Sequence, residues 1–235
     1  MPPLADGLIV GEIKSRAEAL NVFSVQIPGY WIHRNCKLEA EEPPKPGEKV
    51  LYYAHGGGYV TLTAHPDGFM SAVPRGFLEH CSTITRTFSP GYRLLCPEVN
   101  VTHPFPTALL DALAGYTYFV DFGFKEEDIV LCGDSAGGNL APALTLYLVD
   151  NQGKAAKLPR APGMLVLLSP WTDMSESFES NAAESAIRTS SRDWAAPMDS
   201  KEIVEAIKAF LSDKPDEITN AKRCAYTSRT HTSWD

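Results

Sequence analysis

The sequence predicts an α/β fold in which helices flank a mostly parallel β-sheet. Two apolar, strand-like runs, Lys49–Ala54 and Ile129–Cys132, each end in a glycine-rich turn, and stretches typical of helices alternate with such runs along the chain. Strands that alternate with helices form parallel sheets covered on both faces. A chain of 235 residues is long enough for one such domain with its own core, so we expect a single domain over residues 1–235.

The expected elements follow one another in a regular order. A short amphipathic helix over residues 8–20 precedes two early strands, Asn21–Ile27 and Tyr30–His33. The later elements are the strand Lys49–Ala54, a helix over Asp67–His80 weakened by glycine and proline, a β-branched strand over Thr83–Phe88, a helix from Pro106 to a stop at Gly123, the strand Ile129–Cys132, a helix over Leu140–Val149 and a strand over Met164–Leu168.

One short stretch joins a strand end, a sharp turn and a helix start. Residues 133–137 read Gly-Asp-Ser-Ala-Gly and lie in the context that the nucleophile-elbow pattern Gly-x-Ser-x-Gly requires. Gly133 and Gly137 flank Ser135 because a Cβ at either point would crowd the crossover. The turn would raise the Ser135 hydroxyl above the sheet edge, where the following helix points its N-terminus. The simpler alternative is a glycine-rich turn in which serine caps a helix.

A second glycine-rich stretch, His55-Gly56-Gly57-Gly58-Tyr59, follows the strand Lys49–Ala54. Acyl transfer builds negative charge on a carbonyl oxygen, so its site needs N–H donors aimed at that oxygen. Consecutive glycines let a backbone approach closely enough to supply them. Ligands of parallel sheets bind beyond the carboxyl ends of strands, so we expect the two glycine-rich stretches to converge at one site. An ordinary glycine turn is the alternative.

On these motifs the chain resembles the α/β-hydrolase fold, and within it the hormone-sensitive-lipase-like branch of esterases and lipases. The resemblance runs from about residue 20 to about residue 210, and Leu168–Trp171 adds a weaker match. Its four main matches are His55–Tyr59, Tyr92–Leu94, Phe105–Asp111 and Gly133–Asn139. The resemblance implies a serine carboxylic-ester hydrolase that acts through an acyl-enzyme on small uncharged acyl esters.

The resemblance also implies roles for individual residues. Ser135 is the expected nucleophile, and the backbone N–H groups of Ala136, Gly57 and Gly58 are the expected oxyanion donors. Asp134 lies beside Ser135, but neighbouring side chains in an elbow diverge, so we interpret it as structural. Three further residues match positions that support loops and helices rather than transfer protons: His55, His103 and Asp111.

The acid and base of a catalytic triad are not identifiable in the sequence. In this fold they follow the serine in the order Asp or Glu, then His. The only histidine after Ser135 is His231, which lies in a tail over 221–235 that does not resemble the family. No apolar run after residue 171 resembles a next core strand that could hold an acid such as Asp213 or Asp216. We therefore expect an incomplete domain that lacks the last strands of the sheet and is impaired in hydrolysis.

Several explanations of this departure stay open. Either the coding sequence is truncated or mis-spliced, or a rewired triad uses His231, or the chain no longer hydrolyses esters. In the last case it would bind a small molecule without turnover, as do the hormone receptors of the same family, which keep the pocket but lack a working base. Residues 171–211 are interpreted either as a remnant of the cap that covers the site in relatives or as an ordinary surface helix.

Composition argues against several other classes of protein. The formal net charge of −8, with no run of Lys or Arg, makes nucleic acid and anionic membranes poor partners. No apolar run approaches the length of a membrane span, and the first residues do not resemble a signal peptide. The five cysteines are scattered without a Cys-x-x-Cys pair, and no metal-ligand spacing or cofactor motif is present. We expect a cytoplasmic protein whose partner is a small acyl ester, with no metal or cofactor.

Overall fold

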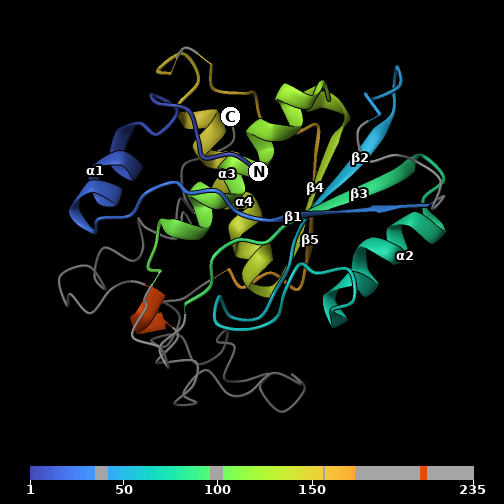
Figure 1. The fold of residues 1–235 in the computed structure, drawn as a ribbon, viewed down its shortest axis with the longest axis horizontal. Helices are drawn as coiled ribbons and strands as arrows, with labels where there is room; N and C mark the ends of the chain where they lie inside the picture. Colours follow the sequence, from blue (N-terminus) through green and yellow to red (C-terminus); the bar gives the residue numbers. More distant parts are fainter. Residues whose placement is uncertain (35–41, 96–102, 156, 173–206, 211–235) are drawn as a thin grey trace, which may run out of the picture.

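The computed structural model describes residues 1–34, 42–95, 103–155, 157–172 and 207–210. In this part of the chain a 5-stranded sheet with the strand order β1-β3-β2-β4-β5 carries helices on both faces (Figure 1). The elements are α1 (Gly11–Ala19), β1 (Gly29–His33), β2 (Lys49–Ala54), η1 (Phe69–Ser71), α2 (Ala72–His80), β3 (Ile84–Pro90), α3 (Thr107–Phe122), η3 (Glu126–Asp128), β4 (Ile129–Asp134), α4 (Ser135–Asp150) and β5 (Met164–Leu168), where η denotes a 3-10 helix.

The sheet is mostly parallel, as the sequence predicts. β2 pairs in parallel with β3 and with β4, β4 pairs in parallel with β5, and β1 runs antiparallel along β3. At the carboxyl end of the β2–β4 pair, Ala54 lies opposite Gly133. This register brings the glycine-rich stretch after β2 and the turn after β4 to the same edge of the sheet.

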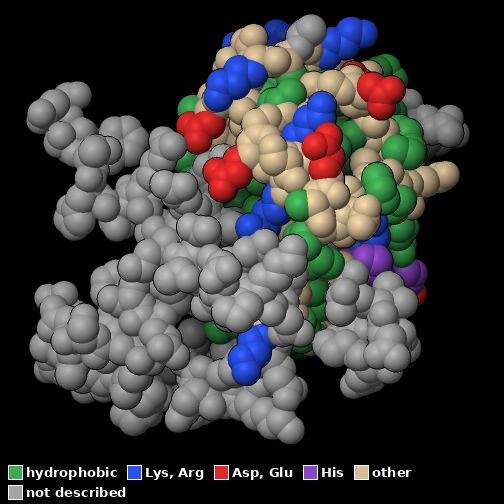
Figure 2. Space-filling model, turned by 90° about the vertical axis from the view of Figure 1, so that its left-hand side faces the viewer, with side chains coloured by type: hydrophobic (Ala, Val, Ile, Leu, Met, Phe, Trp, Pro, Cys, Tyr) green, Lys and Arg blue, Asp and Glu red, His purple; other side chains and the backbone are tan. Residues whose placement is uncertain are grey.

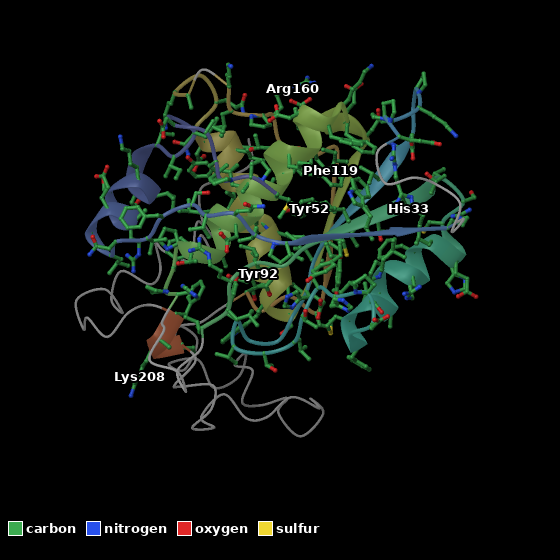
Figure 3. All side chains as sticks on the ribbon, viewed as in Figure 1. His33, Tyr52, Tyr92, Phe119, Arg160 and Lys208 are labelled. Carbon is green, nitrogen blue, oxygen red and sulfur yellow. The ribbon has the colours of Figure 1, made fainter. Side chains whose placement is uncertain are left out.

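The central strands are buried on both faces. Along β2, Val50 and Tyr52 point into a large core built with α3 and α4, whereas Leu51 and Tyr53 point into a smaller core built with α2. Figure 1 shows α2 on the opposite side of the sheet from α3 and α4. In the large core the rings of Tyr52 and Phe119 meet edge to face with centroids 5.5 Å apart (Figure 3). Because successive strand residues point to opposite faces, a strand covered on both sides has a continuous apolar run.

Most expected elements are present, with two differences. The stretch Asn21–Ile27 forms no strand. The Val22 N–H bonds the Ala17 carbonyl at the end of α1, the Ile27 N–H bonds the Met1 carbonyl, and this stretch pairs with none of the described strands. The helix expected over 67–80 is divided into η1 and α2, and Pro74 lies in the first turn of α2, where proline is tolerated. The helix α3 ends at Gly123, whose φ of 109° gives the left-handed cap.

The described surface carries charges of both signs. On the face shown in Figure 2, Lys and Arg side chains lie among Asp and Glu side chains over the described part of the chain. A mixed surface of this kind provides no extended field of one sign to attract a polyanion. None of the described helices has the length and apolar character that crossing a bilayer requires.

The strand β5 lies at the outer edge of the described sheet and is apolar throughout. Its side chains reach exposed fractions of 54% at Met164 and 37% at Leu167. Within the described residues β5 pairs with β4 alone, so its other edge presents unpaired backbone groups. The expectation that the sheet ends here stays a prediction, because most of the expected cap remnant and the whole tail over 221–235 lie outside the described residues.

We expect the 235-residue chain to self-associate through this edge or to be poorly soluble. A charge on an edge strand opposes pairing with another chain, so Leu167→Lys should raise the monomer fraction measured by size-exclusion chromatography with light scattering. The control Phe69→Lys changes a side chain of η1 that is 84% exposed and should not shift the distribution. A monodisperse wild-type monomer that melts cooperatively above about 60 °C would contradict this expectation.

Candidate active site

Ser135 occupies the tip of the turn between β4 and α4. It is the first residue of α4, it is exposed, and its φ of 47° lies in the left-handed region. The glycines on either side of Ser135 are required because a Cβ would not fit at either position. A Cβ on Gly133 would lie 2.1 Å from the Gly137 carbonyl oxygen, and a Cβ on Gly137 would lie 2.0 Å from the Ala54 carbonyl oxygen. The steric reason given for both glycines from the sequence is therefore confirmed.

The loop His55–Tyr59, here called the glycine loop, lies against this turn. Gly57, Gly58 and Tyr59 have φ values of 107°, 62° and 62°, which the two glycines adopt without strain. The Gly56 N–H donates to Oδ1 of Asp134 at 2.9 Å, so the loop contacts the residue directly before Ser135. The structure thus brings the segment with Gly57 and Gly58 to the segment with Ser135 and Ala136.

The carboxylate of Asp134 joins the loop to the strand before it. Besides the Gly56 N–H, Oδ1 accepts a hydrogen bond from the Tyr53 hydroxyl at 2.5 Å. Burial, followed by this hydrogen bond, raises the pKa of Tyr53, so its hydroxyl stays a donor. Asp134 therefore has the structural contacts that the sequence interpretation gave it. Tyr53 was missed, although a hydroxyl in an otherwise apolar strand next to the glycines was a usable signal.

The other end of the glycine loop is held by a second set of contacts. The Tyr59 hydroxyl donates to Oδ1 of Asn139 in α4 at 2.9 Å, and the Leu95 N–H donates to the Tyr59 carbonyl at 2.7 Å. The Tyr59 ring stacks on Phe210 with centroids 4.4 Å apart. Sequence reasoning missed these partners, and nothing in the local pattern around Phe210 indicates that it contacts a loop so far away in the chain.

His55 shapes the loop from inside the protein. Its Nδ1–H donates to the Gly56 carbonyl at 2.7 Å, and its ring stacks on Tyr92 with centroids 4.4 Å apart. The Tyr92 hydroxyl, whose residue is labelled in Figure 3, donates to the His55 carbonyl at 2.6 Å. Asp111 is likewise engaged, because it accepts hydrogen bonds from Nε and Nη2 of Arg93 at 2.9 and 2.7 Å. Both residues have the supporting contacts that the family resemblance implied.

The acid and base are not found in the described part of the chain. No histidine side chain in that part hydrogen-bonds Ser135, and His231, Asp213 and Asp216 lie outside it. The chain after β5 does return to the site, because the Trp171 N–H donates to the Ser135 carbonyl at 2.9 Å. No group of three or more His, Cys, Asp or Glu in the described residues could hold a metal ion.

The chain matches a known protein family. The profile of the alpha/beta hydrolase fold matches residues 51–222, which is most of the chain. The chain belongs to the α/β-hydrolase family. Its hormone-sensitive-lipase-like resemblance is confirmed by a solved esterase of the bacterial hormone-sensitive lipase family, which superposes with a TM-score of 0.56 at 25% sequence identity, over 83% of this chain and 56% of that one.

Two curated relatives resemble this α/β-hydrolase over part of their length. An acetyl-hydrolase of Streptomyces hygroscopicus is 29% identical over 140 residues, which are 60% of this chain and 42% of that protein. The esterase LipU of Mycobacterium tuberculosis is 28% identical over 173 residues, which are 72% of this chain and 52% of that protein. The chain thus spans about half the length of these relatives.

One buried histidine, His55, and two half-buried ones, His33 and His103, predict a loss of stability of this α/β-hydrolase in mild acid. Burial lowers the pKa of His33, His55 and His103, so each takes up a proton more readily in the unfolded chain, where its pKa is about 6.5. Stability is therefore full above about pH 6.5 and falls as the pH drops below it, because the unfolded state then binds more protons.

The test compares melting temperatures at about pH 7.5 and pH 5.5, on either side of the ordinary histidine pKa. The wild type should melt at a lower temperature at the acid pH, and His55→Asn should reduce the difference between the two pH values. His80→Asn is the matched control, because the His80 side chain is 76% exposed. An undiminished difference in His55→Asn would contradict the assignment.

Proposed function

We propose that this chain carries the nucleophile and oxyanion hole of a serine carboxylic-ester hydrolase that acts on small uncharged acyl esters. The single observation that carries the proposal is the exposed Ser135, held in a left-handed conformation at a helix start and set against a glycine loop. A non-glycine residue in that conformation costs about 1–3 kcal/mol and persists where the surroundings enforce it, most often at functional sites.

In the proposed reaction the Ser135 Oγ attacks the ester carbonyl carbon. The backbone N–H groups of Gly57, Gly58 and Ala136 donate to the oxygen on which negative charge develops, and the N-terminus of α4 adds to the same field. The proton released from the Ser135 hydroxyl passes to the leaving oxygen, so the alcohol departs and an acyl group stays on Ser135; water then hydrolyses this acyl group to the free acid and restores the hydroxyl. Removing one such donor typically costs about 10²–10³ in rate, so the loop would contribute strongly to the chemistry.

The substrate class rests on the surroundings and on the relatives. The strands that lead to the site, β2 and β4, are apolar, and no cluster of Lys or Arg in the sequence suggests an anionic substrate. One relative is an acetyl-hydrolase, which supports a short acyl group. Turnover further requires a base, and His231 is the only histidine after Ser135. We propose that turnover by this chain is slow for want of a positioned base.

The nucleophile can be tested without turnover. A fluorophosphonate probe should form a stable adduct on Ser135, detected by peptide mass spectrometry, and added imidazole should speed its formation by supplying the missing base. Ser135→Ala should abolish the adduct, whereas Ser15→Ala, at an exposed serine of α1, should not. A chain that binds a small ester but gives no Ser135 adduct with imidazole would instead be a binding protein without hydrolytic function.

Steady-state hydrolysis of p-nitrophenyl acetate without added imidazole tests the missing base. We expect at best trace activity, because an oxyanion hole and binding alone leave only about 10³–10⁴-fold acceleration over water. Ser135→Ala should barely change this trace rate, and His231→Ala should not change it. If His231→Ala removed a robust activity, the chain would have a rewired triad and this proposal for its base would be wrong.

A further inference from the structure

We infer that two side chains of the nucleophile segment, Asp134 and Asn139, hold the glycine loop at its two ends and so position the oxyanion donors. Asp134 directly precedes Ser135 and bonds Gly56 at the start of the loop. Asn139 lies one helical turn after Ser135 and bonds Tyr59 at the end of the loop. The inference rests on the function proposed above and gives both side chains a positioning role in that chemistry.

The first anchor is a carboxylate oxygen with two donors. Oδ1 of Asp134 accepts from the Gly56 N–H at 2.9 Å and from the Tyr53 hydroxyl at 2.5 Å. The other oxygen fills the space beside the loop, because a Cβ on Gly56 would lie 2.4 Å from Oδ2. Hydrogen bonds to an ionised acceptor are shorter and stronger than those between neutral groups. This anchor therefore fixes the point at which the loop leaves β2.

The second anchor lies in the core. Tyr59 and Asn139 are each 2% exposed, and the Tyr59 hydroxyl donates to Oδ1 of Asn139 at 2.9 Å. A buried hydrogen bond is expensive to break because its partner is left without water or a substitute. Tyr59 also has a left-handed φ of 62° without being glycine, so its conformation has to be imposed by contacts. The bond to Asn139 and the stacking on Phe210 impose it.

Between these anchors lie Gly57 and Gly58, which have no side chains of their own to hold them. Glycine backbone samples more conformations than any other residue, so a free loop would present its N–H groups in many directions. An oxyanion hole works because its donors are fixed before the charge develops. Since both anchors extend from the segment that carries Ser135, movement of the nucleophile moves the donors with it.

The test separates the positioning of the loop from general stability by comparing two buried tyrosines. Tyr59→Phe removes the hydroxyl that bonds Asn139. Tyr116→Phe removes a hydroxyl that donates to the Arg160 carbonyl at the same distance, 2.9 Å. Tyr116 is 0% exposed. Its partner Arg160 lies well apart from Tyr92, which contacts the glycine loop, in Figure 3. The bond of Tyr116 is only partly buried, so Tyr116→Phe should lose no more melting temperature than Tyr59→Phe.

Two readouts are measured on each full-length variant. Amide hydrogen exchange over residues 56–60 should become about fivefold faster in Tyr59→Phe, because a lost hydrogen bond loosens the loop, and should stay unchanged in Tyr116→Phe. The maximal rate of imidazole-supported labelling of Ser135 should fall about tenfold in Tyr59→Phe alone, with the half-saturating probe concentration unchanged.

A matched pair tests the first anchor. Asp134→Ala should increase exchange over residues 56–60 and slow labelling, whereas Asp134→Asn retains an acceptor oxygen and should recover most of both.

Unchanged exchange in Tyr59→Phe would overturn the inference even if labelling fell. Faster exchange with wild-type labelling would overturn the link to chemistry. If wild-type Ser135 is not labelled at all, the proposed function fails first, and the positioning role fails with it.

Discussion

The site depends on a direct contact between two stretches of backbone. The turn after β4 lies so close to the end of β2 that a single Cβ on Gly137 would stand 2.0 Å from the Ala54 carbonyl oxygen. The parallel pairing of β2 with β4 brings these ends together, with Ala54 opposite Gly133. Without the contact, α4 could not begin at Ser135 and the glycine loop could not reach Asp134. Packing in the two cores maintains the register that the contact requires.

Several polar groups around the site hydrogen-bond one another in the absence of any substrate. The Asp134 carboxylate accepts hydrogen bonds from the Gly56 N–H and the Tyr53 hydroxyl, and the His55 carbonyl accepts one from the Tyr92 hydroxyl. Burial raises the pKa of Tyr53 and Tyr92, so these hydroxyls remain protonated donors. A network of this kind can hold a loop rigidly in a low-dielectric environment. Within the described residues, none of these groups hydrogen-bonds the Ser135 hydroxyl, so none of them is placed to act as its base.

The sequence predicted the parts of the structure that depend on local pattern. The strand over 49–54 follows from its continuous apolar run. The stop at Gly123 and the turn around Ser135 follow from the conformational freedom and small size of glycine. The error over Asn21–Ile27 arose because strand-like residues do not reveal whether a neighbouring strand exists. The contacts of Tyr53 with Asp134 and of Tyr59 with Phe210 could not be foreseen for a similar reason, since each depends on the fold that brings distant residues together.

The left-handed conformation of Ser135 has an energetic cost. At a φ of 47° a residue with a side chain is sterically strained, and glycine in the same place would relieve a strain of about 1–2 kcal/mol. Strain of this size is maintained only where the surrounding contacts enforce it. At Ser135 those contacts are the close approach of Gly133 to Gly137 and of Gly137 to Ala54. If Ser135 is the proposed nucleophile, the same crowding that strains its backbone also holds its side chain exposed at the start of α4.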